Sequence, residues 1–251
     1  MMPFTNEFNP GSPFKVTSTT AISDSVAAIR SRIAAAARRS GRNSDEITLM
    51  AVTKTQSIDN IAAAYEAGIR SFGENRVQEF AAKHEQLKHL EGAKFTLIGQ
   101  LQSNKVGKAI DLFSAIHSVD SPRLAERING VVERAGKPTI PIAIEINTGD
   151  PAKAGLDIES PELEQILHSA QRLPHVSIVG FMTIPPFTDN PEDARPYFRR
   201  LRELRDRVKK RNLPGISMEL LSMGMSHDFE VAIEEGSTCV RVGTAIFGER
   251  S

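Results

Sequence analysis

The chain has 251 residues, of which 40% are hydrophobic and 25% are charged, an ordinary globular composition that suits one barrel-sized domain or two smaller ones. Its 31 basic side chains equal its 31 acidic ones, so the formal net charge of zero gives no support to a nucleic-acid partner or an anionic-membrane partner. A single cysteine, Cys239, excludes an intrachain disulfide and suits a reducing compartment.

The first twenty residues predict a flexible leader. They are rich in Pro, Gly, Ser and Thr, and they have neither the basic segment nor the apolar segment of a secretory signal. No apolar run in the sequence is long enough to span a bilayer, and no linker divides the rest of the chain. We therefore expect a cytoplasmic protein with a leader over residues 1–20 and one domain over residues 21–251.

Helical and extended patterns alternate along this domain. Residues 21–40 are rich in alanine and lack proline and glycine, which favours a helix. Ser121, Ser160 and Asn190 each precede a proline, a pair typical of the first residues of a helix. The predicted strands are residues 47–54, 71–75, 94–100, 113–120, 139–148, 176–184, 217–224 and 239–248.

Eight strands that alternate with helices predict parallel pairing, and eight is the number that closes a (β/α)8 TIM barrel. A doubly wound open sheet is the alternative. It would be expected to have a glycine-rich turn after its first strand, and residues 52–57 (VTKTQS) contain no glycine. The pattern therefore favours the barrel, with functional groups at the carboxyl ends of the strands.

Lys54 ends the first predicted strand. It lies two positions beyond Val52 and so on the same face of an extended chain. An ammonium group beside a buried strand is costly unless it is paired, reaches solvent or is used chemically. In a barrel, Lys54 would lie at the mouth, and Asn75 would end the second strand in a corresponding place.

Two glycine-bearing segments, residues 221–230 and 241–249, follow or end the last two predicted strands, where this fold frequently binds phosphate. Glycine lets backbone N–H groups approach a phosphate, and hydroxyls at Ser222, Ser226 and Thr244 can add donors. The helix expected after this first segment would also favour an anion at its start. Together with the lysine, these segments predict a ligand with a phosphate at one end and an aldehyde or ketone at the other.

Arg241 lies within the last predicted strand. Val240 and Val242 alternate with it and would face the helices, so Arg241 would point into the barrel. There it needs an acceptor from a carboxylate, a phosphate or a heteroaromatic nitrogen.

In several of its segments the chain resembles the pyridoxal phosphate homeostasis proteins, relatives of the N-terminal barrel of alanine racemase. The segments run from about residue 47 to the C-terminus and are AVTKTQS, FGENRVQE, LIGQLQSNK, HSVDS, INTGDPAKAGL, GFMTIPP and LSMGMSHDFEVAIEEGSTCVRVGTAIFGER. The resemblance implies a (β/α)8 barrel of the alanine racemase N-terminal-domain type, which is fold type III among pyridoxal-phosphate proteins. It also implies pyridoxal 5′-phosphate (PLP) as the cofactor.

By that resemblance, Lys54 holds PLP as a Schiff base, the phosphate rests on the two glycine-bearing loops, and Arg241 faces the pyridine nitrogen. The chain departs from the usual family pattern at Thr96, where histidine is common, and at Glu145, where glutamine is more usual. The cofactor-binding residues implied are Lys54, Asn75, Ser222, Met223, Gly224, Ser226, Arg241, Gly243 and Thr244.

An always-charged arginine disfavours protonation of the pyridine nitrogen, which weakens PLP as an electron sink and argues against aminotransferase chemistry. In the racemases the second base is a tyrosine of an additional domain, and this chain's two tyrosines, Tyr65 and Tyr197, lie in helical patterns away from the mouth. The family therefore implies a monomeric carrier that maintains PLP homeostasis and supplies apo PLP enzymes without efficient catalysis.

Two alternatives stay open. One is a PLP-dependent amino-acid racemase-like enzyme with weak activity, and the other is a sugar-phosphate barrel enzyme that uses Lys54 in a Schiff base. The six histidines show no metal-ligand spacing, so no metal is expected.

Overall fold

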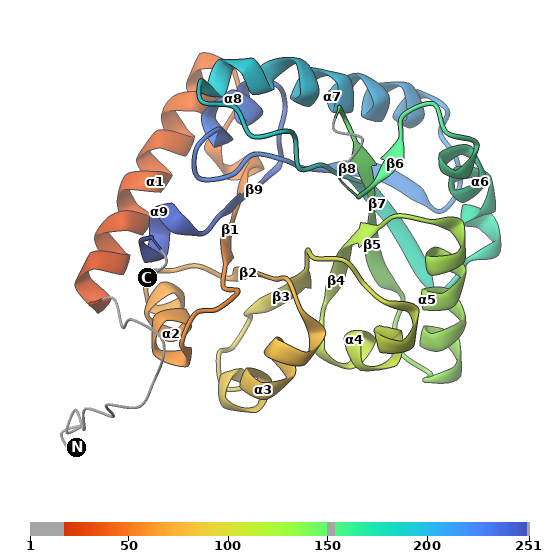
Figure 1. Cartoon of the computed structure of the whole chain (residues 1–251), viewed down its shortest axis with the longest axis horizontal. Helices are drawn as coiled ribbons and strands as arrows, with labels where there is room; N and C mark the ends of the chain where they lie inside the picture. Colours follow the sequence, from red (N-terminus) through yellow and green to blue (C-terminus); the bar gives the residue numbers. More distant parts are fainter. Residues whose placement is uncertain (1–17, 150–153, 250–251) are drawn as a thin grey trace.

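The computed structural model describes residues 18–149 and 154–249, which form a ring of strands surrounded by helices (Figure 1). The strands of the ring all pair in parallel, in the order β1–β2–β3–β4–β5–β7–β8–β9, and β9 pairs with β1 to close it. Their bounds are β1 Thr48–Val52, β2 Ser71–Glu74, β3 Lys94–Leu97, β4 Ala115–Val119, β5 Ile140–Asn147, β7 Val176–Met182, β8 Ile216–Ser222 and β9 Cys239–Val242. The predicted eight-stranded barrel is confirmed.

Helices cover the outside of this ring. Ser121 and Ser160 cap α5 and α6 through their side chains, as predicted, and each is followed by the proline that begins the helix. Asn190 instead caps a short 3-10 helix, Pro191–Ala194, which leads into α7. The helix bounds are α1 Thr19–Arg39, α2 Ile58–Glu66, α3 Val77–Leu87, α4 Val106–Leu112, α5 Pro122–Arg134, α6 Pro161–Ser169, α7 Arg195–Lys210, α8 Phe229–Glu234 and α9 Thr244–Phe247.

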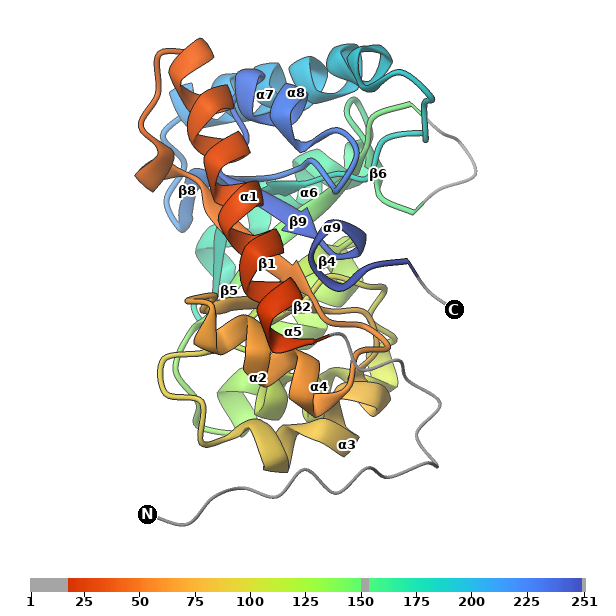
Figure 2. The same ribbon diagram turned by 90° about the vertical axis from the view of Figure 1, so that its left-hand side faces the viewer.

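The first helix begins two residues earlier than predicted, because the hydroxyl of Ser18 accepts a hydrogen bond from the Ala21 N–H and so caps α1 at Thr19. Of the expected leader, residues 1–17 lie outside the described residues. α1 runs along the flank of the barrel in Figure 2 and buries one apolar stripe, which includes Ile22, Val26, Ile29 and Ile33.

The last predicted strand is too long. It ends at Val242, and residues 244–247 form α9 instead. A short apolar run such as Ala245–Phe247 fits one helical turn as well as a strand, and sequence periodicity does not separate the two. In the structure the N–H groups of Ile246 and Phe247 both donate to the Gly243 carbonyl. β6, Leu156–Asp157, was not predicted either, and it pairs in parallel with the last two residues of β5, Ile146 and Asn147.

The apolar side chains form two layers. The main core lies between strands and helices and includes Val240 and Val242, as the alternation in β9 predicts. A smaller cluster contains Met50, Ile98 and Cys239 on the inner side of the ring. β9 therefore has one face against the main core and the helices, and its other face points into the barrel.

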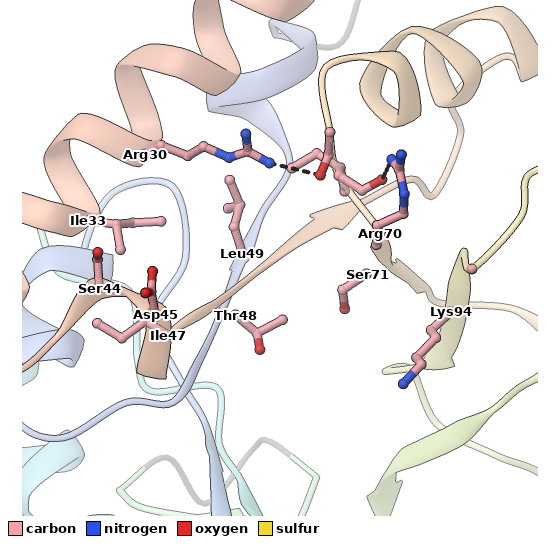
Figure 3. A pocket seen from close by; sticks show the side chains of 13 residues that line it. Arg30, Ile33, Ser44, Asp45, Ile47, Thr48, Leu49, Arg70, Ser71 and Lys94 are labelled. Atoms are coloured by element: carbon pink, nitrogen blue, oxygen red, sulfur yellow. Dashed lines mark hydrogen bonds between the residues drawn. The ribbon is translucent and has the colours of Figure 1, made fainter.

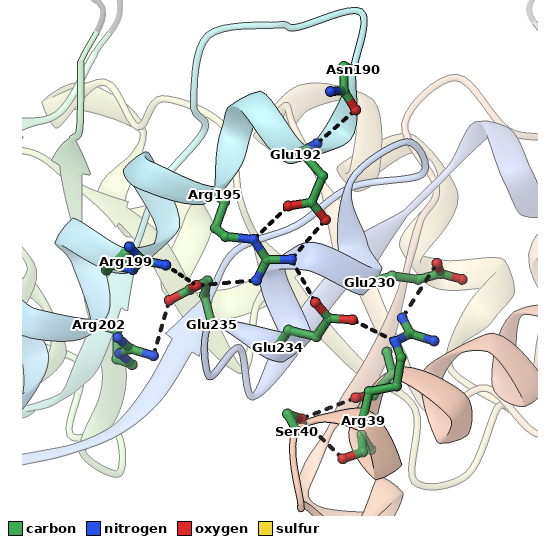
Figure 4. A network of polar contacts seen from close by, with 12 residues as sticks. Arg39, Ser40, Asn190, Glu192, Arg195, Arg199, Arg202, Glu230, Glu234 and Glu235 are labelled. Carbon is green, nitrogen blue, oxygen red and sulfur yellow. Dashed lines mark hydrogen bonds and ion pairs between the residues drawn. The ribbon is translucent and has the colours of Figure 1, made fainter.

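A network of ion pairs ties α7 and α8 to α1 (Figure 4). Arg195 of α7 contacts Glu192, Glu234 and Glu235. Glu234 also receives Arg39 of α1 at 2.7 Å. Networks with several partners hold their geometry better than isolated surface pairs. This one fixes α8, and with it the loop that connects β8 to α8 at the mouth of the barrel.

Among the residues that the structure describes, no helix is long and apolar enough to cross a membrane.

Candidate functional site

A cavity of about 240 Å³ opens at the carboxyl ends of β1 and β9. It is smaller than the roughly 300–1,000 Å³ typical of drug-sized ligand sites, so its size suits a small ligand. Five of the residues predicted from the sequence share it, namely Lys54, Ser226, Arg241, Gly243 and Thr244. Its other lining residues are Val52, Gln56, Phe187, Met225, His227 and Gly248.

Lys54 lies in the tight turn that follows β1. The Gln56 N–H donates to the Thr53 carbonyl at 3.1 Å and closes this turn around the lysine. Lys54 is half-buried and lines the cavity together with Val52, which is the shared face that the extended pattern predicts. Thr55 has a φ of 63°. For a β-branched residue this left-handed conformation costs on the order of 1–3 kcal/mol, so other contacts must hold the turn.

Arg241 points into the barrel, as predicted. Its side chain is 3% exposed, and it donates to the Ser222 carbonyl, to the Ser222 hydroxyl at 2.8 Å and to the Thr183 carbonyl at 2.8 Å. The acceptors observed are therefore backbone carbonyls and a hydroxyl at the ends of β7 and β8. Hydrogen bonds to a charged donor are each worth about 1.5–3 kcal/mol, so Arg241 is rigidly held where it borders the cavity.

The two glycine-bearing loops are joined by hydrogen bonds. The Arg241 N–H donates to the Gly224 carbonyl at 3.0 Å, and the Ala245 N–H donates to the Ser226 hydroxyl at 3.2 Å. Gly224 has a φ of 93°, and a Cβ there would lie 2.6 Å from the Ala232 Cβ, so only glycine fits. The loops thus bring the hydroxyls of Ser226 and Thr244 to one side of the cavity.

Four predicted residues do not line the cavity. Ser222 is fully buried and accepts a hydrogen bond from Arg241, and the Met223 N–H donates to the Cys239 carbonyl. Gly224 shapes the loop, and the Asn75 backbone packs against Gly99. A direct cofactor contact for these four residues stays a prediction.

The amino end of α8 carries an acidic side chain of its own. The Asp228 carboxylate lies there and accepts a hydrogen bond from the Met225 N–H at 2.6 Å. Asp228 is buried, and burial raises its pKa although this hydrogen bond lowers it. The Asp228 side chain does not cap the N–H groups of α8, and an anion at the start of this helix stays a prediction.

Two buried titratable groups near Arg241 were not predicted as site residues. Burial, with the charge of Arg241 adding to it, lowers the pKa of His117 to about 3, so this imidazole is neutral at pH 7. Burial and the nearby Asp120 raise the pKa of Glu145 to about 7, and Arg241 opposes them. The sequence signal was a polar residue within an otherwise apolar strand, in β4 for His117 and in β5 for Glu145.

Phe187 was also missed. It lies on the loop after β7, is 77% exposed and contacts the His227 ring, with centroids 5.6 Å apart and the planes tilted by 30°. The His227 Nε2 lies 3.1 Å from the Asp189 carbonyl, which ties the two loops together. A loop phenylalanine has no periodic signal, so the sequence alone did not place it at the mouth.

The opposite end of the barrel holds a larger cavity of about 540 Å³, at the amino ends of β1, β2 and β3 (Figure 3). Its arginines are engaged by the chain itself. Arg30 donates to the Gly68 carbonyl, and Arg70 donates to the Tyr65 and Ile69 carbonyls. The Arg70 guanidinium also lies over the Tyr65 ring, 3.8 Å from its centroid.

Neither Tyr65 nor Tyr197 lines the cavity that contains Lys54. Within residues 18–149 and 154–249, no group of three or more His, Cys, Asp or Glu side chains is arranged to hold a metal ion.

Comparison with known proteins gives consistent matches over most of the chain. The family model for the alanine racemase N-terminal domain matches residues 25–251. A pyridoxal phosphate homeostasis protein of Aquifex aeolicus is 45% identical over 221 residues, which are 87% of this chain and 94% of that protein. The structure of PipY from Synechococcus elongatus with PLP bound has a TM-score of 0.79 and 35% identity, and the match covers 90% of this chain and 100% of that chain.

An alanine racemase from Corynebacterium glutamicum has a TM-score of 0.68 at 19% identity, with 92% of this chain and 62% of that chain covered. At this identity the likeness concerns the fold alone.

Proposed function

The chain belongs to the alanine racemase N-terminal domain family, as a relative of the pyridoxal phosphate homeostasis proteins, and on that basis we propose that it binds PLP and acts in PLP homeostasis. We further propose that the Lys54 amine holds the cofactor covalently through its aldehyde. The observation that carries this proposal is the convergence of Lys54, Arg241 and the Ser226 and Thr244 hydroxyls on one small cavity.

The residues present fit this cofactor. Lys54 supplies an amine for the aldehyde, and Ser226, Thr244 and the glycine-flanked backbone supply donors for the phosphate. Arg241 supplies a donor for the ring nitrogen and is already held by three acceptors, so it needs no rearrangement to meet a ring. PLP bound here would supply a reactive aldehyde and a ring that withdraws electrons.

The residues around the cavity favour binding of the cofactor without efficient catalysis. Arg241 can only donate a hydrogen bond, so beside the ring nitrogen of bound PLP it would disfavour protonation and limit electron withdrawal. Besides Lys54, His227 also lines the cavity, and its imidazole already meets Phe187 and the Asp189 carbonyl. This environment supports storage and release of the aldehyde.

The test is an absorption spectrum of the purified protein with PLP, before and after borohydride reduction. The wild-type protein should show a visible band, and reduction should leave the cofactor attached to the peptide that contains Lys54. Lys54→Ala and Lys54→Arg should both lack that band and that attachment, because neither has a primary amine. A wild-type protein that stays colourless with added PLP, or a label on another lysine, would overturn the proposal.

Three finer expectations remain predictions, namely delivery of PLP to apo PLP enzymes, a monomeric state and a cytoplasmic location. Delivery is tested by mixing the loaded protein with an apo PLP enzyme and following the recovery of that enzyme's activity. Recovery faster than from an equal amount of protein whose cofactor has been fixed by borohydride would support transfer. Light scattering after size-exclusion chromatography tests the monomer.

A further inference from the structure

The turn that carries Lys54 is held from outside by helix α3. Lys83 Nζ donates to the Thr53 carbonyl at 3.2 Å, and the Thr55 N–H donates to Glu79 Oε1 at 2.6 Å. These two atoms belong to the peptide groups on either side of the Lys54 Cα. Lys83 and Glu79 are themselves joined at 2.8 Å, one helical turn apart. A single ion pair on α3 therefore fixes both peptides that orient Lys54.

A third residue, Glu74 at the end of β2, ties this pair to the barrel. Its carboxylate is fully buried, accepts a hydrogen bond from the Thr53 hydroxyl at 2.8 Å and lies 3.5 Å from Lys83 Nζ. Glu74 Oε2 has no hydrogen-bond partner among the described residues. A buried ion pair adds little net stability, because desolvation offsets most of the attraction. Their position beside the Lys54 turn suggests that they serve the lysine.

The conformation of Thr55 supports this reading. Its φ of 63° belongs to a region that favours glycine at the third position of a tight turn, and a β-branched residue resists it. Glu79 accepts the Thr55 N–H, and the Thr55 hydroxyl donates to the Lys54 carbonyl at 2.6 Å. Without the contact from α3, the turn would be free to relax, and the direction of the Lys54 side chain would change with it.

We propose that Lys83 and Glu79 are positioning residues that hold the Lys54 amine toward the cavity by fixing the peptide groups on both sides of it. The proposal rests on the proposed function, since it assigns the pair a role in the reaction of Lys54 with an aldehyde. The pair itself does not line the cavity, so it acts only through the turn.

The experiment compares the rate at which PLP becomes attached to Lys54 in variants of the pair, measured by borohydride quenching at successive times. Lys83→Met removes the contact to the Thr53 carbonyl, and we expect attachment to slow at least tenfold. Glu79→Ala should also slow it about tenfold. Glu79→Gln keeps an oxygen acceptor for the Thr55 N–H, so it should recover most of the rate.

A matched control lies at the carboxyl end of α3, with Glu85 in the helix and Lys88 at its C-cap. Lys88 and Glu85 form an exposed ion pair that contacts neither flank of Lys54. Lys88→Met and Glu85→Gln should leave the attachment rate within twofold of wild type. Thermal unfolding of every variant shows whether a slow attachment comes from misfolding or from a misplaced Lys54 side chain. Glu79 is part-exposed, so its two variants keep the test valid if Lys83→Met fails to fold.

Two outcomes are opposed. Slow attachment in Glu79→Ala, its recovery in Glu79→Gln and a normal melting temperature for both would support positioning, because a purely structural role would move the melting temperature and not this rate. A wild-type rate in both Glu79→Ala and a folded Lys83→Met would overturn it. If wild-type protein itself fails to attach PLP at Lys54, it is the proposed function that has failed.

Discussion

The two ends of the barrel carry cavities of opposite character. The one at the amino ends of the strands is larger, at about 540 Å³, but Arg30 and Arg70 there are bonded to backbone carbonyls of their own chain. The one at the carboxyl ends is only about 240 Å³, yet Lys54 and the buried Arg241 meet in it beside two hydroxyls. The difference teaches that convergence of chemical groups, more than volume, identifies a site in this fold.

The largest effect on stability is expected from substitution of Arg241, the buried residue of the smaller cavity. Arg241→Met would leave the Ser222 and Thr183 carbonyls buried without their donor. Breaking a buried charged interaction by removing one partner costs about 3–5 kcal/mol, and we expect a loss of that size in the free energy of unfolding, measured with urea. Arg241→Lys, which keeps the charge, should lose less. A loss below about 1 kcal/mol for Arg241→Met would contradict the tight hold described here.

Glu145 provides the next test, because it is a buried titratable group in β5 near Arg241. Its pKa is raised to about 7 by burial and by Asp120, so the folded protein binds this proton more tightly than the unfolded chain. The free energy of unfolding should therefore fall as pH rises from about 4.5 to about 7, by about 2–3 kcal/mol from this group, and then level off.

Glu145→Gln isolates that contribution from Glu74 and Asp228, whose pKa values are raised in the same direction by burial. The variant should match the wild-type protein in urea unfolding at pH 5 and exceed its stability at pH 8. A stability difference that is the same at both pH values would show that Glu145 does not titrate in this range.

The exposed ring of Phe187 should matter for the ligand more than for the fold. It contacts His227 at the mouth and is largely open to solvent, so Phe187→Ala should change the free energy of unfolding by less than about 0.5 kcal/mol. Loss of one aromatic contact, worth about 0.5–1.5 kcal/mol, should speed PLP release roughly 2- to 10-fold. Release is measured by dilution into an amine that traps the aldehyde, with Phe187→Tyr as the control that keeps a ring. Equal release from the alanine variant and the wild-type protein would exclude a covering role.

Sequence reasoning located the lysine end of the site better than its surroundings. Lys54 and Arg241 could be placed because strand alternation fixes which residues share a face, and the structure confirms both directions. Glu79 and Lys83 could not, because a pair four residues apart on a helix has the spacing of an ordinary exposed ion pair. Only the packing of α3 against the Lys54 turn shows that one of them donates to the Thr53 carbonyl.

The same limit applies to the ends of elements. Ser222 was predicted as a hydroxyl donor to a phosphate because it lies in a glycine-bearing segment. As the last residue of β8 it is fully buried and accepts a hydrogen bond from Arg241, and its contact with a phosphate stays a prediction. The direction of a side chain at a strand end depends on one residue more or less of strand, and sequence patterns do not fix that boundary. For the same reason, the eighth predicted strand included residues that form α9 in the structure.

Substitutions at the amino-end cavity should have the smallest effects on stability and on PLP loading. A result close to wild type would strengthen the contrast between the two cavities. Lys94 begins β3 there and is exposed, and Arg30 makes one hydrogen bond to the Gly68 carbonyl from an exposed position. The double variant Arg30→Ala with Lys94→Ala should lower the free energy of unfolding by no more than about 1 kcal/mol, since each side chain is surface-exposed.

PLP loading of this double variant, measured by borohydride trapping, should equal that of the wild-type protein, because neither side chain borders the cavity that contains Lys54. Lys94 also serves as the matched control for Lys54, since both are lysines at the end of a strand that lines a cavity, and they differ in which end of the barrel they occupy. A loss of loading in the double variant comparable with that of Lys54→Ala would mean that the larger cavity binds the cofactor as well. Cavity volume would then identify the binding site better than the convergence of chemical groups does.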